Sequence, residues 1–126
     1  MSATTKKLKV LLFDDDEMFC RMMKQVGKKQ QVSVLTCATM EEFCLHALEG
    51  DFDLVILDYF LDRYIGTEVA LVVDKKPVII VSGATKDVKN RQHIPKEVIG
   101  MIDKEIGPKK VLRMATQMAS DLSRAA

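Results

Sequence analysis

The chain has 126 residues, the size of a single domain, and we expect residues 1–126 to form one. Hydrophobic residues make up 48% of it and charged residues 29%, which is typical of a folded globular protein. Its 19 basic and 18 acidic residues leave a formal net charge of +1, which does not favour a nucleic-acid-binding surface. The apolar runs are too short to span a membrane, and the first residues lack a signal-peptide pattern. We therefore predict a cytoplasmic domain that binds neither nucleic acid directly nor a membrane.

Short apolar runs alternate with segments of helical spacing along the whole chain. The apolar runs predict five strands, at Leu8–Phe13, Val32–Cys37, Asp53–Leu57, Pro77–Val81 and Val98–Ile102. The other segments predict five helices, at Glu17–Lys29, Met40–Leu48, Gly66–Val73, Thr85–His93 and Pro108–Ser123. Unbroken apolar strands are buried on both faces, and parallel neighbours need crossover connections. The alternation therefore predicts a doubly wound α/β fold with a five-stranded parallel sheet.

The cysteines and methionines are predicted to serve the core of the fold and not a metal or redox site. The three cysteines form no CxxC motif and no zinc-type cluster, so we expect them to be reduced and mostly buried. Methionines recur at helical spacing, which predicts two stripes facing the core. The stripes are Met18–Met22–Val26 and Met114–Met118, and the cysteines are Cys20, Cys37 and Cys44.

Polar groups follow four of the five predicted strands, namely Asp14 and Asp15, Asp58, Ser82 and Lys104. The carboxyl ends of parallel strands meet at one edge of the sheet, so these groups are expected to converge. Carboxylates held close together repel one another, and a hard cation such as Mg²⁺ neutralises them. An accessible carboxylate can also attack phosphorus, while a hydroxyl and an ammonium stabilise the charge on the phosphoryl oxygens. The set therefore predicts an aspartyl-phosphate site.

These groups lie in motifs that resemble the receiver domain of two-component response regulators, over about residues 7–122. The motifs are Val10–Asp16, Asp53–Leu61, Gly66, Val81–Ala84 and Ile102–Lys104. The resemblance implies a flavodoxin-like sheet of strand order 2-1-3-4-5. It also implies that Asp58 is the phosphoacceptor and that Ser82 and Lys104 contact the phosphoryl group. The Mg²⁺ ligands implied are Asp14, Asp15, Asp58 and the backbone carbonyl of Phe60. Asp15 and Asp16 are the alternative acidic pair, but the apolar strand ends at Phe13, which favours Asp14 and Asp15.

The resemblance further implies a function in signalling. A sensor histidine kinase or a histidine phosphotransfer protein would donate phosphate from its phosphohistidine. Phosphorylation would then switch a surface that contacts a downstream protein, formed by parts of Thr85–His93, Val98–Ile102 and Pro108–Met118. Such a domain promotes its own phosphorylation and dephosphorylation but is not a turnover enzyme.

Three positions depart from the family pattern. Glu105 replaces the proline that usually follows the lysine, Met101 stands where an aromatic switch residue is usual, and Asp62–Tyr64 replaces a proline or glycine after the phosphoacceptor. Phe60 is bulky and lies two residues past Asp58, so we hypothesise that it slows hydrolysis of the acyl phosphate.

Two other functions fit parts of the pattern. A degenerate receiver would bind partners without being phosphorylated. A haloacid-dehalogenase-type phosphatase would use Asp14–Asp16 as its Asp-x-Asp motif, but it needs a further acidic strand after Lys104 and leaves Asp58 unexplained. An output domain beyond these residues would add a DNA-binding or catalytic function.

Overall fold

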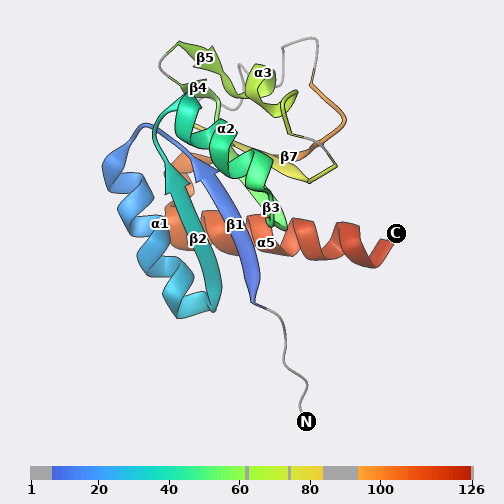
Figure 1. Ribbon diagram of the computed structural model, residues 1–126. Coiled ribbons are helices and arrows are strands. Elements are labelled where there is room, and N and C mark those ends of the chain that lie inside the picture. Colours follow the sequence, from blue (N-terminus) through green and yellow to red (C-terminus); the bar gives the residue numbers. More distant parts are fainter. Residues whose placement is uncertain (1–6, 62, 74, 84–93, 126) are drawn as a thin grey trace.

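A five-stranded parallel sheet runs through the centre of the molecule (Figure 1). The computed structural model describes residues 7–61, 63–73, 75–83 and 94–125. The sheet consists of β1 (Leu8–Phe13), β2 (Val32–Cys37), β3 (Leu54–Asp58), β6 (Val78–Ser82) and β7 (Val98–Asp103). Its order is β2-β1-β3-β6-β7, which is 2-1-3-4-5 when these five strands alone are counted. The predicted fold class and strand order are therefore confirmed.

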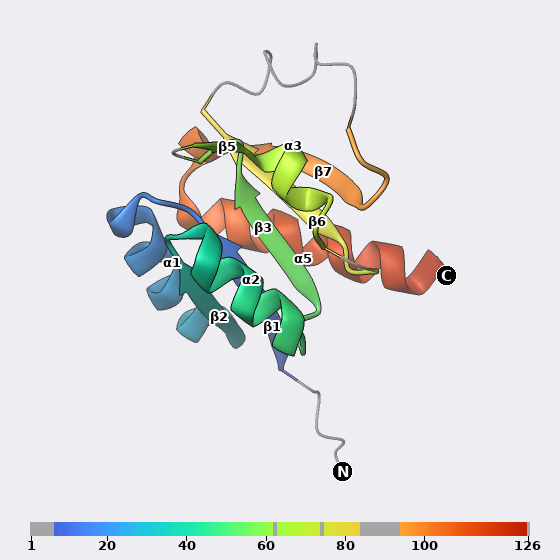
Figure 2. The same ribbon diagram turned by 45° about the horizontal axis from the view of Figure 1, so that its top comes forward.

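Helices cover both faces of the sheet (Figures 1 and 2). The helices are α1 (Glu17–Gln30), α2 (Met40–Glu49), α3 (Gly66–Ala70) and α5 (Pro108–Ala125), with a short 3₁₀ helix η1 (Lys104–Ile106) before α5. The predicted helix Thr85–His93 lies outside the described residues. No helix in the described part of the chain combines the length and apolarity needed to cross a membrane.

Successive residues of β1 enter two separate cores. Val10 and Leu12 pack in the core that includes α1 and α5, whereas Leu11 and Phe13 pack in the core that includes α2 and α3. Side chains alternate between the two faces of a strand, so a strand buried on both faces must be apolar throughout. Cys20 is buried in the first core and Cys37 in the second, Cys44 is half-buried, and all three are free, as predicted.

The stripe predicted on α1 is wrong at both of its methionines, although Val26 packs against the core as predicted. Met18 is 61% exposed and Met22 is 39% exposed, whereas Met23 is fully buried. The face that packs on the sheet is shifted by one residue and consists of Phe19, Cys20, Met23 and Gly27. Gly27 explains the shift, because a Cβ there would lie 2.7 Å from the carbonyl oxygen of Val32. The helix therefore rests with its backbone against β2, a contact that apolar periodicity does not detect.

The stripe predicted on α5 is half correct. Met118 packs against the core, but Met114 is 42% exposed. The buried face of α5 is formed by smaller residues, namely Val111, Leu112, Ala115 and Ala119. The small side chains fit a close approach of α5 to β7, where a Cβ on Gly100 would lie 2.6 Å from Sδ of Met118.

The connection between β3 and α3 also differs from the prediction. The sequence predicts no helix or strand between Leu57 and Gly66, but Phe60–Leu61 (β4) and Tyr64–Ile65 (β5) form a small antiparallel hairpin. The hairpin returns to β3 at Gly66, whose amide donates a 2.7 Å hydrogen bond to the carbonyl of Tyr59. Helix α3 ends at Ala70 instead of Val73, because the next three amides bond three residues back, as in a 3₁₀ turn.

Candidate phosphorylation site

The polar groups at the strand ends meet at the carboxyl edge of the sheet. Asp58 lies beside Val81 in the β3–β6 register, and Ser82 lies beside Asp103 in the β6–β7 register. Lys104 follows directly as the first residue of η1. Strand pairing therefore places Asp58 and Ser82 at the ends of adjacent strands, with Lys104 directly after the next strand.

Three carboxylates form the centre of this edge. One oxygen from each of Asp14, Asp15 and Asp58 lies within 4.8 Å of the other two. Asp14 is fully buried, Asp58 is 9% exposed, and Asp15 is exposed. The cluster therefore has two buried members and one that faces solvent.

Burial makes it energetically unfavourable for Asp14 and Asp58 to be ionised at the same time. Desolvation raises the pKa of Asp14. Desolvation, together with the charge of Asp14, raises the pKa of Asp58 to about 6, although Lys104 acts in the opposite direction. A divalent cation would relieve this repulsion, and Mg²⁺ prefers carboxylate oxygens in an open shell completed by water. The donor set and its crowding therefore fit Mg²⁺.

Lys104 supplies the positive charge of the site. Its Nζ lies 2.9 Å from Oδ2 of Asp14, 3.7 Å from Oδ2 of Asp58 and 3.8 Å from Oδ2 of Asp16. Burial alone would lower the pKa of Lys104, but the hydrogen bond and charge of Asp14, with the other carboxylates, raise it. The ammonium also lies 4.6 Å from the centre of the Phe19 ring. The side chain therefore carries a full charge beside the carboxylate proposed to accept phosphate.

The turn that carries Lys104 forms without the usual proline. A carboxylate oxygen of Asp103 accepts a 2.9 Å hydrogen bond from the amide of Glu105, and this bond caps η1. Asp103 thus fixes the turn locally in place of the ring of a proline.

Asp16, unlike Asp14 and Asp15, is the N-cap of α1. Its side chain accepts a 3.1 Å hydrogen bond from the amide of Phe19 and caps α1. Its own amide donates a 2.9 Å bond to Oδ1 of Asp14. This geometry favours Asp14 and Asp15 as the acidic pair, and Asp16 as the start of the helix.

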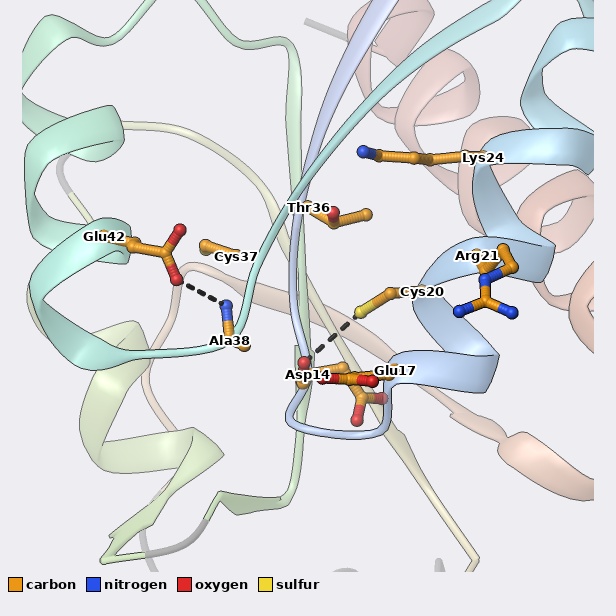
Figure 3. A pocket seen from close by; sticks show the side chains of 9 residues that line it. All are labelled: Asp14, Glu17, Cys20, Arg21, Lys24, Thr36, Cys37, Ala38 and Glu42. Carbon is orange, nitrogen blue, oxygen red and sulfur yellow. Dashed lines mark hydrogen bonds between the residues drawn. The ribbon is translucent and has the colours of Figure 1, made fainter.

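A groove of about 340 Å³ opens beside Asp14 at the edge of the sheet, between α1 and α2 (Figure 3). Within it, the thiol of Cys20 donates a 3.3 Å hydrogen bond to the carbonyl of Asp14. Burial and the nearby charges of Asp14 and Asp16 raise the pKa of this thiol to about 11, so it stays protonated and remains a donor. The sequence pattern predicts only that Cys20 is reduced and buried, and it does not single out Phe19. Both lie in the first turns of α1, directly after the aspartates.

Phe60, the bulky residue after the acceptor, and Met101, which replaces the aromatic switch residue, lie in different surroundings. Phe60 is 54% exposed, and its ring packs edge-on against that of Tyr59, with centroids 4.7 Å apart. Met101 is partly buried against the core beneath α2 and α3. Phe60 is therefore on the surface two residues past Asp58, while Met101 belongs to the interior of β7.

The family model of the response regulator receiver domain matches residues 10–116. The chain belongs to this family. Receiver domains are signalling domains of two-component systems, so the predicted resemblance is confirmed over most of the chain. No curated protein matches the sequence.

Solved receiver domains have the same fold at low sequence identity. A receiver domain protein from Methanospirillum hungatei is 20% identical, with a TM-score of 0.78 over 96% of this chain and 100% of that one. The chemotaxis regulator CheY4 of Vibrio cholerae is 20% identical, with a TM-score of 0.74 over 90% and 99%. The response regulator TrrA of Thermotoga maritima, solved with Mg²⁺ and BeF, is 18% identical, with a TM-score of 0.75 over 88% and 98%.

Proposed function

We propose that this receiver domain accepts a phosphoryl group on Asp58 from the phosphohistidine of a sensor histidine kinase or a histidine phosphotransfer protein. The observation that carries the proposal is the cluster of Asp14, Asp15 and Asp58 with the ammonium of Lys104 beside it. A carboxylate nucleophile, a set of metal ligands and a fixed cation are the groups that phosphoryl transfer requires.

The residues that would hold Mg²⁺ are Asp14, Asp15, Asp58 and the backbone carbonyl of Phe60. When bound, Mg²⁺ supplies positive charge to the phosphoryl oxygens and to the crowded carboxylates. Two solved relatives of the same fold support this: the Thermotoga maritima protein contains Mg²⁺ and BeF, and one from Burkholderia pseudomallei contains a phosphorylated aspartic acid and a calcium ion.

In the proposed transfer, an oxygen of Asp58 forms a bond to phosphorus as the bond from phosphorus to the histidine nitrogen breaks. The bonding electrons pass to the leaving imidazole. Lys104 and Ser82 stabilise the charge on the phosphoryl oxygens. Among the described residues, a Cβ on Gly83 would meet no atom within 4 Å, so these residues leave room at the end of β6.

Exposed apolar residues suggest where partners bind. Met18 and Met22 line a hollow of about 310 Å³ that also includes Gly83 and Lys104, so an apolar helix of the phosphate donor would fit beside the site. The surface proposed to contact a downstream protein includes parts of β7 and α5, and Met114 of α5 is exposed there. The remaining part of that surface, Thr85–His93, lies outside the described residues.

Intact-mass measurement tests the proposal. The protein is incubated with acetyl phosphate, with and without Mg²⁺, as wild type, as Asp58→Asn, and as Asp121→Asn, a control on an exposed carboxylate of α5. We expect wild type and the control to gain one phosphoryl group only with Mg²⁺, and Asp58→Asn to gain none. A gain that persists in Asp58→Asn would assign the nucleophile to another carboxylate. No gain in folded wild type would indicate a degenerate receiver.

A further inference from the structure

The ammonium of Lys104 is enclosed on two sides by groups of different chemistry. On one side are the carboxylates of Asp14, Asp58 and Asp16, each within 4 Å. On the other side is the ring of Phe19, with its centroid 4.6 Å from Nζ. An ammonium at this distance from an aromatic face is attracted by the negative potential of the ring, more strongly when water is excluded. The Lys104 side chain is only 20% exposed, so the contact is largely shielded.

Phe19 is fixed more firmly than Lys104. Its ring is 5% exposed and belongs to the core between the sheet and the helices α1 and α5. Its amide is bonded to the capping carboxylate of Asp16, which sets its position at the start of α1. Lysine has a long flexible stem, and its ammonium is a point charge without directional preference among nearby acceptors. The rigid ring therefore limits where the ammonium can go.

The Phe19 ring can hold the ammonium of Lys104 without neutralising its charge, which a carboxylate cannot do. Asp14 and Asp16 hold Lys104 by opposite charge, and in doing so they compete with a phosphoryl group for it. A neutral aromatic face attracts the ammonium and leaves its positive charge available. We expect the contact to persist when Lys104 exchanges Asp14 for a phosphoryl oxygen on Asp58, because Nζ already lies 3.7 Å from Oδ2 of Asp58.

From this geometry we propose that Phe19 is a positioning residue for Lys104, holding its ammonium beside Asp58 for phosphoryl transfer. The inference rests on the proposed function, because the transfer is the step that it serves. Phe19 touches no reacting atom and acts only through Lys104.

Graded fluorination of the ring separates electrostatics from packing. Mono-, di- and trifluorophenylalanine are introduced at position 19, since fluorine weakens the negative face while the ring keeps almost the same shape. The matched control is the same series at Phe43, a fully buried ring that stacks on Phe13 in the other core. The initial rate of Mg²⁺-dependent phosphorylation by acetyl phosphate is expected to fall stepwise at position 19, by roughly three- to tenfold over the series. It should stay level at position 43. A level series at both positions, or an equal fall at both, would overturn the proposal.

Coupling to Lys104 is tested with Phe19→Leu in two backgrounds. The variant should slow phosphorylation in the wild-type background and have no further effect in Lys104→Met. An equal effect in both backgrounds would show that Phe19 acts through general packing, contrary to the proposal.

The NMR shift of the ε-methylene protons of Lys104 reports the contact without any phosphorylation. The Phe19 ring should move these protons upfield, and the movement should disappear in Phe19→Leu but not in Phe43→Leu. If wild type shows this shift but takes no phosphoryl group, the proposed function fails while the contact stands. If wild type is phosphorylated but the fluorinated series is level, the function stands and the positioning role fails.

Discussion

Nζ of Lys104 lies 2.9 Å from Oδ2 of Asp14, closer than the 3.7 Å that separate it from Oδ2 of Asp58. Asp14 is fully buried, and apart from this ammonium no group of the described residues donates a hydrogen bond to the same oxygen. The ammonium is therefore its main neutralising neighbour in the described part of the metal-free chain. Lys104 stabilises the fold at Asp14 and, in the proposed function, serves chemistry at Asp58.

Replacing Lys104 by methionine is expected to destabilise the metal-free protein. The change leaves the buried Asp14 carboxylate without its partner, which we expect to lower the free energy of unfolding at pH 7 by about 1–3 kcal/mol, since Asp14 can respond by taking up a proton. Urea unfolding followed by circular dichroism in EDTA measures the loss. Adding Asp14→Asn to Lys104→Met should recover most of it. A loss of the same size in the Asp14→Asn background would show that the ion pair is not the cause.

The stability of the metal-free protein should fall as the pH rises from about 4 to about 6. The folded-state pKa of Asp58 is raised to about 6 from an ordinary value of 3.8, so across this range the folded state holds a proton that the unfolded state has lost. Above pH 6 the ionised carboxylate remains buried at a cost of about 1–3 kcal/mol. Asp58→Asn should therefore unfold at higher urea concentration than wild type at pH 7.5 and show little difference at pH 4. An equal difference at both pH values would contradict this assignment.

Mg²⁺ should stabilise the protein through Asp15 and not through Asp16. At a Mg²⁺ concentration one hundred times the dissociation constant, binding adds about 2.7 kcal/mol, which thermal unfolding detects. Asp15→Asn is expected to lose most of this gain. Asp16→Ala removes the helix cap and costs about 1 kcal/mol without metal, but its gain from Mg²⁺ should match that of wild type. If both Asp15→Asn and Asp16→Ala lost the gain from Mg²⁺, the acidic pair would be Asp15 and Asp16 instead.

Phe60 is expected to lengthen the life of the aspartyl phosphate. Its ring lies on the surface next to Tyr59, two residues from the acceptor, where it would hinder the approach of water. Once acetyl phosphate is removed, Phe60→Asn should lose its phosphoryl group several-fold faster than wild type, as followed by intact mass. The control is Tyr64→Asn, which changes another exposed aromatic residue of the same hairpin. Equal decay of all three proteins would disprove the role.

The sheet and the grouping of the site could be predicted because both depend on short-range sequence patterns. Unbroken apolar runs mark strands buried on both faces, and polar residues directly after them fall at one edge by topology alone. The packing face of α1 could not be predicted in this way. Stripes beginning at Met18 and at Phe19 have the same spacing, and the deciding contact is the bare backbone of Gly27 against Val32. The β4–β5 hairpin was missed for a similar reason, because its closure depends on a hydrogen bond between Gly66 and Tyr59.

The contact between Gly100 and Met118 has a consequence for how these positions can change in evolution. A Cβ at position 100 would lie 2.6 Å from Sδ and 3.3 Å from Cε of Met118, so the two sites share one volume. A homologue with a larger residue at position 100 would need a shorter side chain at position 118 or a displaced α5. The two positions should therefore covary, although 17 residues separate them on the chain.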